Sequence, residues 1–104
     1  MALMDITVIP LDKGEGSFSS FVADLQRLLA ESGCNYRLHD MGTTIEGDVA
    51  VLFDVAQKLH DYAFTQGGKR VYTVIKVDDR RDKTVQLGDK CASVQAKIAP
   101  AEPL

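Results

Sequence analysis

The chain has 104 residues, 45% of them hydrophobic and 26% charged, which is the length and composition of one globular domain with a single modest core. Its net charge of −3 argues against a nucleic-acid partner, because a phosphate-binding surface must be basic. No apolar run approaches the ~20 residues that span a bilayer and no secretory signal is recognisable, so we expect a cytoplasmic protein without a membrane partner.

Alternation of apolar and polar residues predicts strands, and apolar residues three and four positions apart predict helices. In chain order, the predicted elements are a strand over 3–11, a helix from about 18 to Gly33, strands over 35–39 and 43–47, a helix from Asp48 to the Gly67-Gly68 pair, a strand over 70–77 and a short helix over about 85–98. The charged residues 78–83 are either a solvated loop or part of a network between subunits. Residues 99–104 are expected to be a frayed tail.

The two long helices are recognised by the side chains that they would bury. In the first, Ser17 or Ser19 can cap the start, and Gly33 can end the helix in a left-handed conformation. Its apolar face carries Phe18, Phe21, Val22, Leu25, Leu28 and Leu29. The apolar face of the second helix, which Asp48 can cap, carries Leu52, Val55, Ala56, Leu59 and Ala63.

The resulting order, βαββαβ followed by a helix, predicts a ferredoxin-like sandwich of the α+β class. In this fold a four-stranded antiparallel sheet carries two helices on one face. We expect residues 1–104 to form one such domain. Two helices can cover only one face of the sheet, so the properties of the other face bear on function.

The strand residues expected on the uncovered face are mixed in character. If Met4, Ile6, Val8, Tyr36, Leu38 and Ile45 face the helices, alternation sends outward Asp5, Thr7, Ile9, Arg37, His39, Thr44 and Glu46. The last strand is largely apolar on both sides, so its orientation stays open. Because this face is too apolar for solvent and too polar for a core, we expect it to be buried in a homodimer or homotetramer.

Residues that could perform catalysis or bind a metal do not form a recognisable set. His39 and His60 lie on different predicted elements with no second ligand at metal-binding spacing, and His60 is expected to be solvated. Cys34 and Cys91 are expected to be reduced, packed thiols. There is no phosphate-binding glycine loop and no serine-centred nucleophile motif. We therefore expect no enzyme, no cofactor and no metal.

Glu46 is the polar residue that most needs an explanation, because it alternates with apolar residues in a predicted strand. Two interpretations stay open. Glu46 pairs with Arg37 across a subunit interface, or it is held in a partly buried pocket to bind a cationic or amidine-like group. In the second interpretation Thr7 and Thr44 supply neutral hydrogen-bonding groups, and Met41 supplies an adaptable apolar wall.

Several segments give the chain a resemblance to a known family. They are Met-Gly-Thr-Thr-Ile-Glu-Gly-Asp at 41–48, Lys-Arg-Val at 69–71, Ile-Lys-Val-Asp-Asp-Arg-Arg-Asp-Lys at 75–83, Val-Ile-Pro at 8–10 and Asp-Lys at 89–90. With these segments the chain resembles, over about residues 4–98, a family of small thiamine-binding proteins. The resemblance implies a ferredoxin-like fold assembled as a dimer of dimers, and non-catalytic binding of thiamine or its hydroxymethylpyrimidine moiety.

The resemblance also implies where the ligand would bind, namely at the segment 42–46 and at the first strand. Together with the apolar wall expected of Met41, the predicted ligand contacts are Thr7, Met41, Thr43, Thr44 and Glu46. The chain departs from the family at residues 12–14, where relatives more often have a short loop of the Gly-Thr type, so no contact is carried over there.

Other functions fit the same residues. The chain would be an interaction module if its uncovered face only forms the oligomer, with Glu46 tied to Arg37 and no small-molecule ligand. It would be an enzyme acting on a thiamine precursor if His39 served as a base, or a regulatory protein that senses thiamine.

Overall fold

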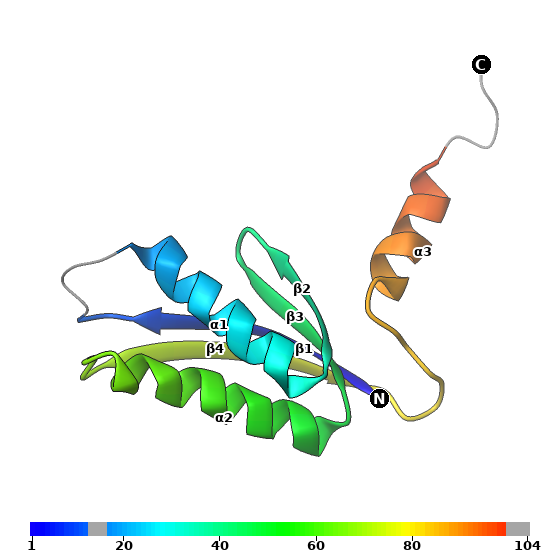
Figure 1. The fold of residues 1–104 in the computed structure, drawn as a ribbon. Helices are drawn as coiled ribbons and strands as arrows, with labels where there is room; N and C mark the ends of the chain where they lie inside the picture. The colour runs from blue at the N-terminus through cyan, green and yellow to red at the C-terminus, as the bar shows by residue number, and fades with distance from the viewer. Residues whose placement is uncertain (13–16, 100–104) are drawn as a thin grey trace.

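The structure of the protein is a computed structural model that describes residues 1–12 and 17–99 (Figure 1). Its elements are, in chain order, β1 (Ala2–Pro10), α1 (Phe18–Ser32), β2 (Asn35–His39), β3 (Gly42–Gly47), α2 (Val49–Thr65), β4 (Val71–Asp79) and α3 (Asp89–Ile98). The predicted order and the α+β class are confirmed. The expected frayed tail, apart from Ala99, and part of the divergent loop at 12–14 lie outside the described residues.

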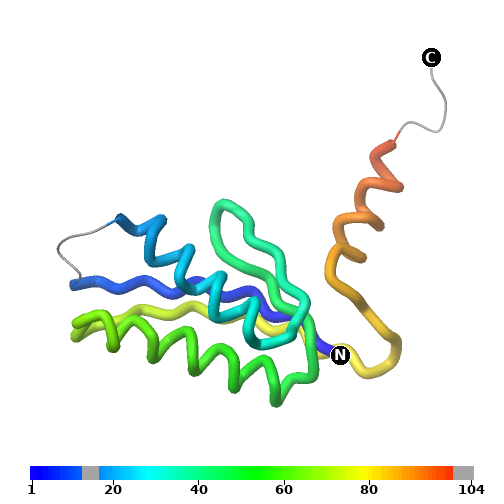
Figure 2. Tube along the Cα trace, viewed as in Figure 1, coloured from blue at the N-terminus to red at the C-terminus, as the bar shows by residue number. Residues whose placement is uncertain are grey.

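The four strands form one antiparallel sheet in the order β2-β3-β1-β4, so β1 and β3 are central and β2 and β4 are the edges. Helix α2 packs over β1 and β4 and against α1. The chain trace in Figure 2 shows both helices running along the strands. They cover one face of the sheet, as predicted, and the opposite face, which we call the open face, carries neither helix.

The register of β1 settles which strand residues face the helices. Its even-numbered residues from 2 to 8 are buried, whereas its odd-numbered residues are only half-buried. On β4, Ile75 and Val77 lie opposite Ile6 and Met4 and share the helix side. The open face of β4 therefore presents Tyr72, Val74 and Lys76, which resolves the orientation that alternation alone left undecided.

Helix α1 begins and ends as its sequence predicts. The Ser17 side chain accepts a hydrogen bond from the Ser20 backbone N–H at 3.4 Å, which satisfies one of the free donors of the first turn. At the other end Gly33 has φ +78°, a left-handed conformation that a side chain would strain. The helix buries Phe21 and two leucines of the predicted apolar face against the sheet.

Helix α2 buries all five residues that its periodicity predicts. Asp48 occupies the N-cap position, as predicted. Its side chain makes no capping hydrogen bond, however. Gln66 ends the helix, and Gly67 follows in the left-handed conformation. None of the helices in the described ranges is both long enough and apolar enough to cross a bilayer.

The C-terminal part of the fold differs from its prediction. β4 continues to Asp79 and α3 begins only at Asp89. Residues 84–86 form an irregular connection, and a turn at 87–88 leads into the helix. No residue of α3 is buried, and Figure 1 shows this helix projecting away from the sandwich. Cys91 is therefore an exposed thiol, which corrects the expectation that it is packed, whereas Cys34 is half-buried; both are free.

The core predicts a large effect for one leucine of α2. Leu59 is 1% exposed, so Leu59→Ala should lower the free energy of unfolding by about 2–5 kcal/mol through lost contacts and a new cavity. Val51→Ala is the matched control on the same helix, because Val51 is 44% exposed and should change stability by only about 0.5 kcal/mol. Urea unfolding followed by circular dichroism measures both free energies. Equal destabilisation by the two substitutions would contradict the assignment of Leu59 to the buried side of α2.

Candidate functional site

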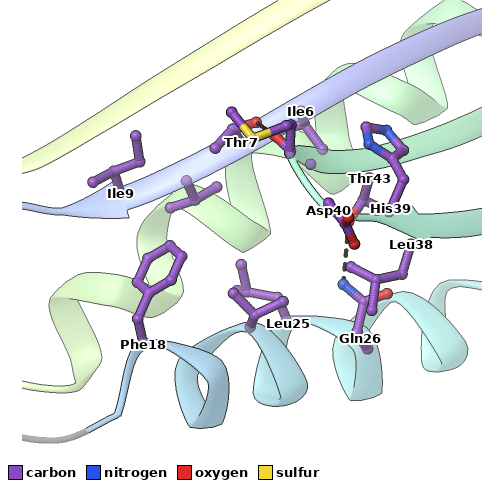
Figure 3. A pocket seen from close by; sticks show the side chains of 14 residues that line it. Ile6, Thr7, Ile9, Phe18, Leu25, Gln26, Leu38, His39, Asp40 and Thr43 are labelled. Atoms are coloured by element: carbon purple, nitrogen blue, oxygen red, sulfur yellow. Dashed lines mark hydrogen bonds between the residues drawn. The ribbon is translucent and has the colours of Figure 1, made fainter.

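A cavity of about 470 Å³ lies between the first half of α1, the end of β1 and the hairpin that joins β2 to β3 (Figure 3). Helix α1 contributes Phe18, Leu25 and Gln26 to its lining. β1 contributes Thr7 and Ile9, and the hairpin contributes the residues from 38 to 43. The walls are largely apolar, which is the usual character of a small-molecule site.

The cavity exists because β1 is longer than its neighbour β3. The two strands pair from Ala2 opposite Gly47 to Ile6 opposite Thr43, and beyond this point β1 continues without β3 to Pro10. The first turns of α1 lie over this end of β1. The cavity therefore lies beside α1 and β1, at the place that a longer β3 would fill.

Gln26 brings a polar group into this apolar site. Its Nε2 donates a hydrogen bond to Thr43 Oγ1 at 3.2 Å, drawn as a dashed line in Figure 3, and its Oε1 is buried without a hydrogen-bond partner. Exchanging the two ends of the amide would leave the nitrogen unpaired instead of the oxygen. Either way, one polar atom of the amide lacks a partner, which costs about 1–3 kcal/mol in a buried position.

The hairpin turn is held against β1 by a close contact. Thr7 Oγ1 donates to the Met41 carbonyl oxygen at 2.9 Å. A Cβ atom added at Gly42 would lie 2.7 Å from Thr7 Oγ1 and 3.1 Å from the Ile6 carbonyl oxygen. Glycine is therefore required at residue 42 for the turn to approach β1 this closely, and the approach sets one wall of the cavity.

His39 sits beside the cavity and reaches the open sheet face. Its Nε2 lies 3.1 Å from Asp5 Oδ1, to which an Nε2–H group can donate, and 3.3 Å from Thr44 Oγ1. The side chains of His39 and Asp5 are both partly exposed. His60, in contrast with the prediction, is not simply solvated, because its Nδ1 lies 2.7 Å from Thr73 Oγ1.

Glu46 lies at the other end of the open face. Only 7% of the residue is exposed, and its Oε2 accepts hydrogen bonds from Asn35 Nδ2 at 3.4 Å and from the Leu87 backbone N–H at 3.2 Å. The strand register places it opposite Leu3 and Asn35 and away from Thr7. The carboxylate therefore has partners within its own chain and holds the connection to α3 against the sheet.

The predicted ligand residues are thus divided between two places. Thr7, Met41 and Thr43 line the cavity together, Thr44 is linked to it through His39, and Glu46 lies apart. That Glu46 contacts a ligand stays a prediction. Its expected position beside Thr7 is corrected by the register, whereas Arg37 lies on the same face, opposite Thr44 and two residues along β2 from Asn35.

The sequence prediction missed Gln26 as a site residue. A signal was available, because Gln26 stands four residues after Val22 and three before Leu29, within the apolar face of α1. A polar residue at such a position needs partners, and the hydrogen bond from Nε2 leaves the Oε1 of this one unpaired.

The charged segment after β4 forms ion pairs within the chain. Arg80 pairs with Asp82 at 2.6 Å and Arg81 with Asp79 at 2.7 Å, and the hydrogen bond from each arginine holds the pKa of its aspartate below the usual range. Among residues 1–12 and 17–99 no group of three or more histidine, cysteine or acidic side chains could hold a metal ion.

Comparison with known proteins places this chain in a family. The model of a family described as thiamine-binding protein matches residues 4–95. The UPF0045 protein YqgV of Bacillus subtilis is 42% identical over 104 residues, which cover 96% of this chain and 100% of that protein.

Solved structures show the same fold. The hypothetical protein MJ1052 of Methanocaldococcus jannascii has a TM-score of 0.80 at 25% identity and covers 89% of this chain and 94% of its own. A Thermotoga maritima protein, TM0486, named as a candidate thiamine biosynthesis or salvage protein, has a TM-score of 0.73 at 19% identity and covers 89% of this chain and 97% of its own. At that identity the likeness concerns the fold alone.

The contacts of Glu46 predict a structural effect on the connection to α3. Glu46→Ala removes the acceptor of the Leu87 N–H and should lower the free energy of unfolding by about 1–3 kcal/mol. The Leu87 amide should also exchange faster with solvent in hydrogen-exchange NMR. Glu31→Ala, an exposed position on α1, is the control and should change neither quantity. Unchanged exchange at Leu87 would contradict the assigned contact.

Proposed function

The chain belongs to the thiamine-binding protein family, and from this premise we propose that it binds thiamine, or the hydroxymethylpyrimidine part of thiamine, without converting it. The proposed binding site is the cavity between α1 and the β2–β3 hairpin. The family match supports the ligand class, and the half-paired amide of Gln26 supports the site.

The Gln26 amide is the single observation that carries the proposal. An aminopyrimidine presents an amino donor next to a ring-nitrogen acceptor, and a carboxamide presents the complementary acceptor and donor in one plane. Glutamine reads the similar donor and acceptor edge of adenine in this bidentate way. With one Nε2 hydrogen donated to Thr43, the second hydrogen and Oε1 are left for a ligand, and rotation about the broad terminal torsion of the side chain can present them.

The other walls fit the rest of such a ligand. Phe18, Leu25 and Leu38 offer apolar surface for a flat ring, and Phe18 and Leu38 are still about half exposed without one. A cavity of this volume is within the range of small-molecule sites, about 300–1,000 Å³. Asp40 lines the same cavity, and its carboxylate would offset the positive charge of a thiazolium ring.

Assembly is part of the proposal. The open face carries apolar side chains on β1 and β4, among them Ile9, Tyr72 and Val74, with Tyr72 57% exposed. We propose that a second copy covers this face, in a cytoplasmic homo-oligomer, because burial would remove these groups from water. An interaction module without a ligand is the second candidate, favoured by the exposed apolar side chains of β4.

Calorimetry with variants of one residue tests the site. Gln26→Ala should weaken thiamine binding by roughly tenfold or more, because the aminopyrimidine loses its paired partner. Gln66→Ala, which changes an exposed glutamine beyond the end of α2, is the matched control and should bind like the wild type. Equal affinity of the Gln26 variant would remove this cavity from the proposal.

Two further titrations define the ligand. A thiamine analogue with oxygen in place of the pyrimidine amino group should bind the wild type far more weakly than thiamine does. In Gln26→Ala the affinities for thiamine and for this analogue should differ less. Glu46→Gln tests the other predicted contact: a loss of affinity there would move the ligand toward the open face. No binding of thiamine or of the free pyrimidine by the wild type would favour the interaction module.

A further inference from the structure

The charges around the cavity bear on a property of the ligand that the proposed function leaves open. Hydroxymethylpyrimidine and thiamine are both alcohols, and each can carry a phosphate ester on its hydroxyl oxygen. A phosphate ester adds a charge of about −1.5 to −2 near pH 7. The charged side chains beside the ligand therefore decide which of the two forms, alcohol or ester, the site binds.

Asp40 brings a negative charge to the cavity. Neither a lysine nor an arginine lines it among residues 1–12 and 17–99. His39 also lines the cavity and can ionise, but its Nε2 lies 3.1 Å from an oxygen of the Asp5 carboxylate. When both nitrogens of the ring carry a proton, Asp5 balances the charge of the ring. The described lining therefore offers an anion no uncompensated positive charge.

Two arginines that are close to the site in the sequence are directed elsewhere. Arg27 follows Gln26 on α1, but its side chain pairs with Asp24 and is 72% exposed. Arg37 of β2 packs against Gly88, where an added Cβ atom would lie 3.5 Å from two nitrogens of the guanidinium group. An anion in the cavity would have neither guanidinium group as a partner, because neither residue lines the cavity.

The position of an ester follows from the pairing proposed for Gln26. In the hydroxymethylpyrimidine ring, the carbon that bears the hydroxymethyl group is bonded to the carbon that bears the amino group. If the amino group donates to Gln26 Oε1, the ester lies beside this oxygen. Oε1 is buried, and Thr43, which accepts from the same amide, is only 6% exposed. A phosphate group in this place would lose water without gaining a cation, which is unfavourable.

We propose that the cavity binds the free alcohol and rejects its phosphate ester, and that Asp40 determines this selectivity. The inference rests on the proposed function, because it concerns the chemical form of the ligand in the same cavity. In Figure 3 Asp40 and Gln26 lie toward the same end of the cavity, and Phe18 lies toward the other. The carboxylate of Asp40 is thus at the end where the pyrimidine ester would lie.

Repulsion of this kind has a measurable size. A carboxylate and a doubly charged phosphate about 6 Å apart weaken binding by roughly tenfold in water at low ionic strength. Salt screens the repulsion between exposed charges, because the Debye length is about 8 Å at 0.15 M. The lost hydration of an ester beside Gln26 adds to the repulsion and responds less to salt, since this end of the cavity is buried.

The first turn of α1 is a feature beside the cavity that favours an anion. A helix N-terminus carries free N–H groups and a partial positive charge. Ser17 occupies part of it, because its side chain accepts the N–H of Ser20. Phe18 begins the helix, and Gln26 follows eight residues later, which is about 12 Å along the axis. The ester of the pyrimidine, beside Gln26, is therefore beyond the reach of this turn.

Thiamine phosphate differs from the pyrimidine ester in where its charge lies. Its phosphate is at the end of the hydroxyethyl chain of the thiazolium ring, on the far side of that ring from the pyrimidine. With the pyrimidine paired to Gln26, this phosphate lies farther from the buried amide than an ester on the pyrimidine itself. The cavity therefore rejects the pyrimidine ester more strongly than thiamine phosphate.

This selectivity places the bound ligand before a phosphoryl transfer. A kinase moves the terminal phosphoryl group of a nucleoside triphosphate to the hydroxyl oxygen of the alcohol. The hydroxyl proton is lost and a nucleoside diphosphate is released. The product carries the ester that the cavity rejects, so this transfer also ends binding. The protein would thus hold the alcohol that such a kinase consumes.

Calorimetry with the wild-type protein at low ionic strength tests the selectivity. Hydroxymethylpyrimidine should bind at least roughly tenfold more tightly than its phosphate ester. Thiamine should also bind more tightly than thiamine phosphate, by a smaller factor. Equal or tighter binding of the pyrimidine ester overturns the selectivity and leaves the proposed function standing. Binding of neither the alcohols nor the esters overturns both.

Variants of Asp40 test the residue that determines the selectivity. Asp40→Asn should narrow the affinity ratio of pyrimidine alcohol to ester severalfold, and Asp40→Lys should narrow it further. The affinity for the alcohol, which is uncharged, should stay the same. Asp61→Asn is the matched control, because it removes the same charge from an exposed position of α2 and should leave the ratio unchanged. A wild-type ratio in both Asp40 variants overturns the role of Asp40.

A salt titration separates charge repulsion from an effect on folding. Raising the sodium chloride concentration should narrow the ratio in the wild-type protein and change it much less in Asp40→Asn, because the screened charge is then absent. Circular dichroism checks that the variants fold, which is expected because Asp40 is exposed. The same dependence on salt in the wild type and in Asp40→Asn overturns the assignment to Asp40.

Discussion

The register of β1 against its two neighbours is the constraint on which the other features depend. Met4 and Ile45 lie opposite each other and are both fully buried, so a slip of one residue would turn the apolar side of β1 away from the helices. The same register ends at Ile6 opposite Thr43, while the pairing of β1 with β4 continues to Pro10. One strand thus has a complete partner on one side and a truncated partner on the other. The cavity lies on the truncated side and the largely apolar strand β4 on the complete side.

A cavity in this position has an energetic cost that its polar group increases. The interior of a protein is close-packed, and apolar walls that face no atoms lose dispersion contacts. The unpaired end of the Gln26 amide adds the cost of an unmade hydrogen bond. A ligand that fills the walls and pairs the amide would recover both contributions in one event. The site therefore gives up folding stability for an interaction that only a complementary molecule completes.

The sequence predicted the parts of the fold that rest on local periodicity. All five buried residues of α2 and the glycine end of α1 follow from spacing and from backbone preference. The orientation of β4 could not be predicted, because both of its sides are apolar and only pairing with β1 distinguishes them. The start of α3 was placed too early, because the N–H of Leu87 bonds to Glu46, a residue 41 positions away, instead of continuing the helix. The site was predicted in part: Thr7, Met41 and Thr43 converge, whereas Gln26 was read only as one position of a helix.

Thr7 connects the cavity to the other side of the sheet. Its hydroxyl holds the Met41 carbonyl at the cavity, and in the register of the sheet it lies opposite Val74 of β4. Glycine at residue 42 permits the close approach of the turn, because a Cβ atom added there would lie 2.7 Å from Thr7 Oγ1. A side chain at residue 42 would therefore push the turn away from β1 and move one wall of the cavity.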